Sequence, residues 1–300
     1  MMPIFNSHTV SAFIAKKANL WHSFFVKSTM PDFYNFKPEL EPDQRSDIKL
    51  NARPFFYEAA DANKEKLVIL VHGYSSSPYD FQELGRFLAQ HNINARGVLL
   101  AGHGGDFEHF AQADYRDWWW SVRREVDSYG QDYKNIFLIG YSFGSNLALD
   151  LAARYPSKLA GVICLGTSVY LRNYKKIKLL YLFLSLFRDR VNKRPMPKSQ
   201  KTLYERDGGH VTLPMKSLGS FLQFINQISR RQIEQVTVPI LLVHSRDDLI
   251  SSPRSSEMIF ERISSSNKEL FILNEYEHNP LHSGNRDLIF DKVLTFLTSP

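Results

Sequence analysis

Ile136-Phe137-Leu138-Ile139-Gly140-Tyr141-Ser142-Phe143-Gly144 is the segment of this 300-residue chain that says most about its structure. The apolar residues 136–139 predict a buried strand, and residues 143–155 have the pattern of a helix. A Gly-x-Ser-x-Gly sequence between a strand and a helix is typical of a tight turn that needs the glycines, here Gly140 and Gly144. Such a turn exposes the hydroxyl of Ser142 above the end of a sheet, so Ser142 is a candidate nucleophile. A serine in an ordinary turn is the alternative.

Apolar runs and amphipathic segments alternate on both sides of this motif. The predicted strands are 66–71, 93–100, 135–139, 159–165, 239–244 and 269–273. The predicted helices are 80–91, 117–129, 143–155, 253–263 and 287–297. Continuous apolar strands between helices are typical of a mostly parallel, doubly wound sheet that is covered on both faces. The fold class is therefore α/β, with chemistry expected at the carboxyl ends of the strands.

The alternation breaks at residues 168–235, where we expect a helical lid inserted into the core. The core itself is then made of residues 55–167 and 236–300. Residues 1–54 form an N-terminal extension, in which a helix with one apolar face precedes an irregular, proline-containing lead-in. That helix either packs on its own domain or lies on a membrane surface.

A serine hydroxyl is a weak nucleophile unless a positioned base takes its proton. In strand–turn–helix sites of this kind an acid and then a histidine follow the serine along the chain. His278 lies in a polar loop between the last predicted strand and the last predicted helix, which favours it as the base. His282 is the alternative, whereas His244 ends a strand and precedes the candidate acids. Asp247 and Asp248 follow that strand, and only one of the two can point at the imidazole.

Two backbone N–H groups are expected to stabilise the oxyanion that forms when the serine attacks a carbonyl. Phe143 follows the nucleophile at the N-terminus of a helix and supplies one of them. The other is expected from Tyr74 in His72-Gly73-Tyr74, because Gly73 ends a strand and lets the backbone approach closely. His72 is predicted to support this loop as a buried, hydrogen-bonded imidazole.

Together these residues resemble the carboxylesterase and monoacylglycerol-lipase branch of the α/β-hydrolase fold, over roughly residues 65–300. The landmarks of the resemblance are His72-Gly73-Tyr74, Gly102-His103-Gly104, Asp117-Trp118-Trp119, the turn at Ser142, Asp248 and His278. In that family the acid stands in a G-x-x-D pattern, which corresponds here to Ser245-Arg246-Asp247-Asp248 and selects Asp248. The chain departs from the family pattern at Ser245 and at Glu277, where glycine is usual. The resemblance implies no metal and no dissociable cofactor.

The positive charge of the chain is concentrated in one part of it. The net charge is +6, and residues 172–206 carry eleven Lys or Arg against two acids, so this segment holds the whole excess. Such a segment predicts contact with an anionic membrane surface or an acidic substrate, and no nucleic-acid-binding module is recognisable. A single cysteine, Cys164, excludes an internal disulfide, and no apolar run is long enough to span a bilayer. We therefore expect a cytoplasmic protein with peripheral membrane association as an option.

Residues 179–187 of the insertion are almost wholly apolar and have basic residues at both ends. A helix of this kind either packs over an acyl pocket or also touches anionic lipid headgroups. Both interpretations predict a small-molecule ester with a hydrophobic acyl part as the substrate.

The sequence thus predicts a serine hydrolase that cleaves short or medium acyl esters, or monoacylglycerols, through an acyl-enzyme. A peptidase or amidase with the same triad and an acyltransferase are alternatives, since a fold does not determine its reaction. A non-catalytic lipid-binding protein is the alternative of a different class.

Overall fold

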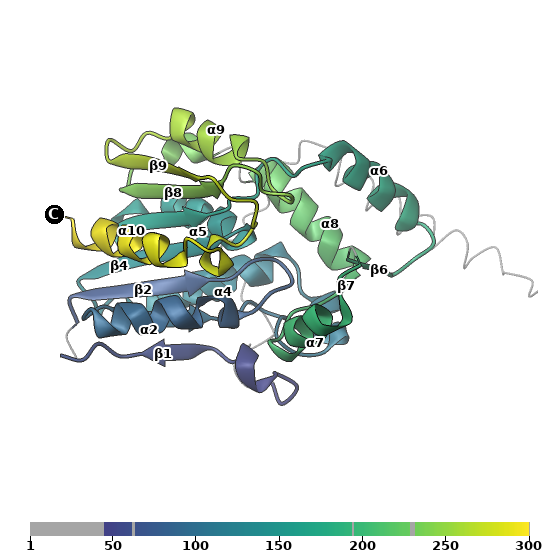
Figure 1. The fold of residues 1–300 in the computed structure, drawn as a ribbon, viewed down its shortest axis with the longest axis horizontal. Coiled ribbons are helices and arrows are strands. Elements are labelled where there is room, and N and C mark those ends of the chain that lie inside the picture. The colour runs from purple at the N-terminus through teal and green to yellow at the C-terminus, as the bar shows by residue number, and fades with distance from the viewer. Residues whose placement is uncertain (1–44, 62–63, 194, 229–231, 300) are drawn as a thin grey trace, which may run out of the picture.

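The structure is a computed structural model that describes residues 45–61, 64–193, 195–228 and 232–299. Its centre is a seven-stranded sheet with the strand order β1-β3-β2-β4-β5-β8-β9 (Figure 1). The strands are β1 (Phe55–Tyr57), β2 (Lys66–Val71), β3 (Asn94–Val98), β4 (Asn135–Tyr141), β5 (Gly161–Leu165), β8 (Ile240–Ser245) and β9 (Lys268–Leu273). All neighbours are parallel except β1, which pairs antiparallel with β3 at the edge.

Helices cover both faces of the sheet, as the alternating sequence pattern predicts. One face carries α2 (Gln82–Gln90) and α10 (Arg286–Thr298), and the other carries α4 (Tyr115–Tyr129), α5 (Phe143–Arg154) and α9 (Arg254–Arg262). Strands β5 and β8 are buried along their whole length, because helices pack on both of their faces. The prediction of a mostly parallel α/β sheet is confirmed.

Residues 168–235 leave the sheet after β5 and return to it at β8. They contain α6 (Tyr174–Leu184), β6 (Arg190–Asn192), α7 (Lys198–Arg206), β7 (Thr212–Pro214), α8 (Met215–Gln223) and a π-helical turn (Phe224–Ile228). Figure 1 shows these elements beyond the carboxyl ends of the parallel strands. The insertion was expected to be helical, and it also contains the short antiparallel pair of β6 and β7. We call residues 168–235 the insertion.

Some short elements were not predicted from the sequence. Strand β1 has three residues and helix α3 (Phe107–Gln112) has six, and neither length displays a periodic pattern. Single 3-10 turns also occur, at Leu50–Ala52, Pro78–Phe81, Pro156–Lys158, Ile233–Gln235 and Pro280–His282. The helix expected near the N-terminus lies outside the described residues, as does most of the lead-in that follows it.

Across the described ranges, no helix combines the length and the apolar composition that are needed to cross a membrane.

Candidate active site

The turn between β4 and α5 holds Ser142 in a strained backbone conformation. Its φ of 52° lies in the left-handed region, which is uncommon for a residue with a side chain. Glycines on both sides are required sterically, since a Cβ on Gly144 would lie 2.0 Å from the carbonyl oxygen of Val71. A Cβ on Gly140 would lie 2.4 Å from the backbone of Gly144. The glycines therefore let β2, β4 and α5 pack closely enough to form this turn at the end of the sheet.

Three side chains from distant parts of the sequence meet at this turn. Nε2 of His278 lies 2.8 Å from Oγ of Ser142, and Nδ1 of His278 lies 2.7 Å from Oδ2 of Asp248. His278 comes from the loop after β9, and Asp248 from the loop after β8. The structure thus brings together the three residues that the sequence pattern singles out. The two alternatives, Asp247 and His282, are exposed.

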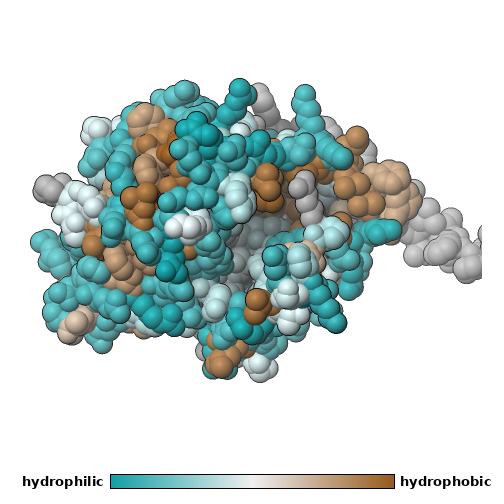
Figure 2. Space-filling view, viewed as in Figure 1, coloured by the Kyte–Doolittle hydropathy of each residue, from teal (hydrophilic) through white to brown (hydrophobic). Residues whose placement is uncertain are grey.

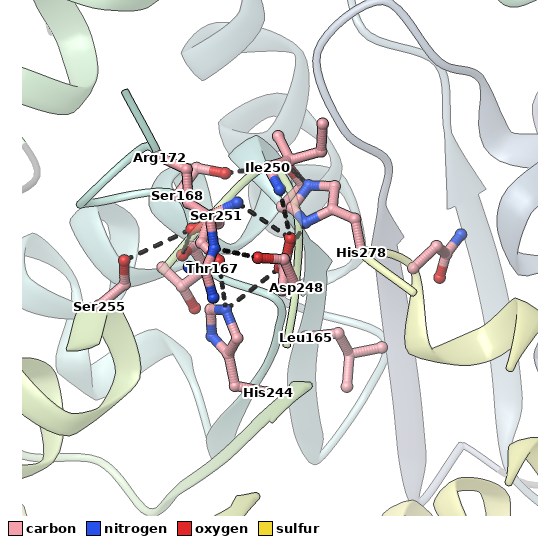
Figure 3. A network of polar contacts seen from close by, with 12 residues as sticks. Leu165, Thr167, Ser168, Arg172, His244, Asp248, Ile250, Ser251, Ser255 and His278 are labelled. Carbon is pink, nitrogen blue, oxygen red and sulfur yellow. Dashed lines mark hydrogen bonds and ion pairs between the residues drawn. The ribbon is translucent and has the colours of Figure 1, made fainter. Parts of the chain in front are cut away.

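The carboxylate of Asp248 is fully buried and accepts several hydrogen bonds (Figure 3). Oδ1 accepts from the backbone N–H groups of Ile250 (2.7 Å) and Ser251 (3.0 Å). Burial opposes ionisation, but hydrogen bonds from His244 and His278 outweigh it and hold the pKa of Asp248 well below its usual value. Asp248 therefore remains a carboxylate at any pH at which a histidine can act as a base.

The loop after β2 lies beside Ser142. His72 is fully buried, its Nδ1 lies 2.9 Å from the carbonyl oxygen of Gly73, and the N–H of Leu100 donates to its Nε2 at 3.1 Å. Burial lowers the pKa of His72 to about 4, so the ring is neutral and supports the loop by hydrogen bonds. A Cβ on Gly73 would lie 3.3 Å from Cβ of Ser142, which reflects the close approach predicted for this glycine.

The insertion holds the same loop from the other side. The carbonyl oxygen of Ser75 accepts from Oη of Tyr204 (2.6 Å) and from the N–H of His210 (2.9 Å). Oγ of Ser77 donates to the carbonyl oxygen of Asp207 at 2.5 Å. Ser75 has a φ of 62°, another strained conformation outside glycine. These bonds hold the strained backbone next to Tyr74, one of the two predicted oxyanion donors.

A cavity of about 760 Å³ opens over Ser142 and His278. Much of its wall is apolar and comes from the insertion, through Leu171, Ile177, Leu180, Tyr181, Leu184, Val191, Met196, Leu213, Met215, Leu218, Phe221 and Leu222. Polar and charged residues also line the cavity: Asp80, Arg172, Lys176, Asn192, Lys193, Tyr204, Asn279 and His282. Figure 2 shows the molecular surface hollowed between the sheet domain and the insertion. The cavity can therefore accept a molecule that carries both apolar and polar groups.

Two contacts of the site were missed by sequence reasoning. Oγ of Ser168 lies 3.0 Å from Oγ of Ser142, and Nε2 of His244 lies 3.2 Å from Oδ2 of Asp248. Nothing in the sequence marks Ser168, which follows β5 in a short turn. His244 is disfavoured as the base because it ends a strand, and that position in the sequence does not indicate the direction of its ring.

The lone cysteine has no part in this site. Cys164 is fully buried in β5, and burial raises the pKa of its thiol far above the usual value. It therefore behaves as a small buried apolar residue, as its sequence context predicts.

The arrangement is chemically competent for acyl transfer to a serine. His278 can accept the proton of Ser142 through Nε2 while Asp248 holds its Nδ1–H. Helix α5 begins directly after Ser142, and the N–H groups in the first turn of a helix have no partner within the helix. A carbonyl compound in the cavity would thus meet the hydroxyl of Ser142 together with an imidazole placed to take its proton.

Comparisons with known proteins agree with this chemistry. A model of the serine aminopeptidase S33 family matches residues 62–284. A carboxylesterase of Bacillus subtilis is 24% identical over 261 residues, which cover 82% of this chain and 96% of that protein. A thermostable monoacylglycerol lipase of a Bacillus species is 24% identical over 246 residues, covering 82% of this chain and 94% of the lipase.

The fold has counterparts among solved structures. A structure from work on LipS and LipT, two metagenome-derived lipolytic enzymes, superposes with a TM-score of 0.73 at 19% identity. The match covers 83% of this chain and 98% of that one. The likeness extends over most of the described residues and establishes the α/β-hydrolase fold.

Proposed function

The chain belongs to the serine aminopeptidase S33 family of α/β-hydrolases, and from this premise we propose that it hydrolyses carboxylic esters through Ser142, His278 and Asp248. One observation carries the proposal: the hydrogen-bonded series of these side chains opens into a large cavity with an apolar wall. The carboxylesterase and lipase names of its relatives support the same reaction.

In the first step Oγ of Ser142 attacks the ester carbonyl while Nε2 of His278 takes its proton. The N–H groups of Phe143 and Tyr74 are proposed to bind the oxyanion. The bond from the carbonyl carbon to the alkoxy oxygen then breaks, His278 returns the proton to that oxygen, and the alcohol leaves. Asp248 keeps the imidazole in the right tautomer and stabilises its charged form.

In the second step water attacks the acyl-enzyme along the same path. His278 removes a proton from the water, the oxyanion forms in the same place, and Ser142 leaves with the proton that His278 returns. The products are a carboxylic acid and free enzyme, and neither step requires a metal or a dissociable cofactor.

The cavity wall favours an ester whose acyl part is apolar. Burying a methylene group contributes about 0.8 kcal/mol, so each carbon that reaches the apolar wall of the insertion strengthens binding. We therefore propose short to medium acyl esters or monoacylglycerols as substrates. Residues 168–235 then act as a lid over the acyl chain.

Peptide cleavage is the competing activity for this family. An aminopeptidase must hold the free ammonium group of its substrate, usually with carboxylates. Among the described residues that line the cavity, Asp80 is the only acid, and His282 and Lys193 interact with it. Burial raises the pKa of Asp80. The ammonium group of a peptide substrate would add a positive charge beside Lys193, which is disfavoured. This supports ester over peptide substrates.

A panel of matched substrates tests the function. We expect p-nitrophenyl esters to be turned over with kcat/KM rising over the first few acyl carbons, by about threefold to fourfold per methylene. Monoacylglycerols of the same acids should be hydrolysed as well, with glycerol and the free acid as products. Aminoacyl p-nitroanilides should be cleaved far more slowly than the esters.

The panel also separates the rival functions. Faster cleavage of the aminoacyl anilides than of any ester would replace our proposal by a peptidase. Acyl transfer to added alcohol in preference to water would instead identify an acyltransferase. No turnover together with no labelling by a fluorophosphonate would point to a non-catalytic lipid-binding protein.

We also propose that helix α6 contacts anionic membranes. Leu179, Phe183 and Phe187 are 70%, 61% and 74% exposed, although they are large and apolar. Figure 2 shows apolar side chains gathered over α6. The opposite side of this helix lines the cavity through Ile177 and Leu184, whereas Leu179 and Phe183 stay largely exposed in the part of the chain that the structure describes. A lipid surface would cover the exposed side of α6, and the cavity would then open next to the membrane from which an apolar substrate comes.

Lysines of α6 provide a test of membrane contact. Lys175→Ala/Lys176→Ala/Lys178→Ala should weaken binding to vesicles of phosphatidylcholine with 30% phosphatidylglycerol, by about tenfold or more at low salt. Binding to phosphatidylcholine alone should change little. Sedimentation with vesicles measures both.

The control removes an equal charge at the opposite end of the sheet. Lys64, Lys134 and Lys158 are exposed beside the amino ends of β2, β4 and β5. Their triple alanine variant should bind anionic vesicles like the wild type. Equal binding by the α6 variant and the wild type would eliminate the membrane proposal and leave the hydrolase proposal untouched.

A further inference from the structure

A second histidine contacts the carboxylate of Asp248. His244, the fifth residue of β8, is fully buried, and its Nε2 lies 3.2 Å from Oδ2 of Asp248. The same oxygen accepts from Nδ1 of His278 at 2.7 Å. Figure 3 shows the carboxylate between the two imidazoles. Two histidines therefore share one oxygen, whereas the mechanism above uses only His278.

The surroundings of His244 indicate which of its nitrogens carries the proton. Nε2 faces two acceptors, Oδ2 of Asp248 and the carbonyl oxygen of Ser251 at 3.3 Å. Neither acceptor has a hydrogen to offer, so Nε2 must be the donor. Nδ1 lies 2.8 Å from Oγ of Ser256, which is buried at the start of α9 and can donate its hydroxyl hydrogen. Both nitrogens are satisfied by a neutral ring, and His244 needs no charge to occupy this site.

We propose that His244 is a positioning residue for the triad: its Nε2–H holds Oδ2 of Asp248 in place and shares the negative charge of the carboxylate with His278. The inference rests on the proposed function, because it concerns the same hydrolytic site. The backbone N–H groups of Ile250 and Ser251 anchor Oδ1 alone. Without His244, Oδ2 would be held only by the imidazole that it is meant to orient.

The shared charge has a predictable effect on the base. A hydrogen bond from a neutral donor draws electron density from the carboxylate, so the carboxylate stabilises the protonated form of His278 less. Removing the donor should make His278 easier to protonate. The acid limb of the pH profile of kcat/KM should then move to higher pH, since only the neutral base accepts the proton of Ser142.

Other charged or titratable groups near the triad are the same in wild type and variants. The side chain of Arg172 donates to the backbone carbonyl oxygen of Asp248, and the ring of Tyr141 lies 5.3 Å from that of His278. Glu277 precedes His278 in the chain, and Asp80 interacts electrostatically with Tyr141. A shift seen on replacing His244 alone is therefore attributable to His244.

The test compares two replacements of similar size. His244→Met fills the space without a donor, whereas His244→Gln keeps an N–H near the position of Nε2. We expect His244→Met to lower kcat by roughly tenfold with KM within about twofold, and to move the acid limb upward by about half a pH unit. His244→Gln should recover most of kcat and the wild-type acid limb. Ser256→Ala removes only the partner of Nδ1 and should have a smaller effect in the same direction.

Melting temperatures, measured together with kcat and the pH profile, distinguish a positioning role from a merely structural one. A residue that only fills the core would lower the melting temperature and leave kcat and the pH profile of the folded protein unchanged. Folded His244→Met and His244→Gln with profiles that superimpose on the wild type would overturn the inference. If His244→Met does not fold, Ser256→Ala still decides, because a folded Ser256→Ala whose kcat and acid limb equal those of the wild type would contradict the inference. Failure of the wild type itself to hydrolyse esters would instead refute the proposed function.

Discussion

Ser142→Ala is expected to lower kcat for p-nitrophenyl ester hydrolysis by about 10⁴-fold or more, and to abolish labelling by a fluorophosphonate. The reason is that Oγ of Ser142 is the atom placed 2.8 Å from Nε2 of His278 and facing the cavity. Alanine removes the nucleophile without adding volume to a packed turn. Serine and alanine both carry a Cβ, so the cost of the strained backbone is the same in the variant, and the fold should be retained.

A distant serine gives the matched control for this experiment. Ser157 is exposed in a 3-10 turn before β5, far from the carboxyl ends of the strands. Ser157→Ala should be labelled and should hydrolyse esters at the wild-type rate. Residual labelling of folded Ser142→Ala at the wild-type rate would mean that another residue is the nucleophile.

Asp248→Asn is expected to reduce kcat by about 10⁴-fold at neutral pH. Its amide keeps the size of the side chain but presents an N–H₂ group where Oδ2 now accepts from His278 and His244. The imidazole of His278 is then driven toward the tautomer that has a proton on Nε2, which cannot accept the proton of Ser142. The loss should appear mainly in kcat, because the residue does not line the cavity.

The neighbouring aspartate is the control, and it also settles the choice between two adjacent acids. Asp247 is exposed, and Asp247→Asn should retain kcat within about twofold. A large loss in Asp247→Asn with normal activity in Asp248→Asn would assign the acid to the other residue. Stopped-flow acylation with p-nitrophenyl acetate measures the step in which the two variants should differ most.

The prediction of the fold from the sequence rests on local patterns. Strands such as 66–71 and 135–139 are continuous apolar runs because helices bury both of their faces, and this burial leaves a signal in the sequence itself. The glycines around Ser142 also predict the tight turn, since no other residue fits so close to the backbone of β2. Elements that span fewer than two periods of their pattern, such as β1 and α3, leave no such signal.

The site was predictable in its residue types and their order, and less so in its contacts. His278 and His282 are four residues apart in one loop, and Asp247 and Asp248 are adjacent. The sequence favoured His278 by its place before the last helix, and it favoured Asp248 only through the family resemblance. The turn after β8 directs the side chain of Asp248 inward and that of Asp247 to solvent. Which aspartate contacts His278 therefore depends on the conformation of the loop after β8. That conformation depends on the residues that pack against the loop.

The contacts that sequence reasoning missed depend on how loops and strands pack, including one between residues only four apart in the chain. His244 reaches Asp248 only because the loop after β8 folds back over the strand, and Ser168 reaches Ser142 because β4 and β5 are neighbours in the sheet. Tyr204 of the insertion donates to the carbonyl oxygen of Ser75 in the loop after β2, across 129 residues. Neither residue of such a contact stands in a sequence motif that would predict it.

The sequence by itself therefore determined the α/β-hydrolase architecture, the turn at Ser142 and the set of residues from which an acid and a base can be drawn. The tertiary structure decided what the sequence left open: it places the favoured Asp248 and His278 in hydrogen-bonded line with Ser142, adds a second imidazole at the carboxylate, and leaves Leu179 and Phe183 of α6 exposed in the part of the chain that it describes. The physical reason is that backbone periodicity and steric fit are local properties, which the order of residues records directly. Side-chain direction and hydrogen-bond sharing depend on distances between segments, and those distances exist only after the sheet and the insertion have packed together.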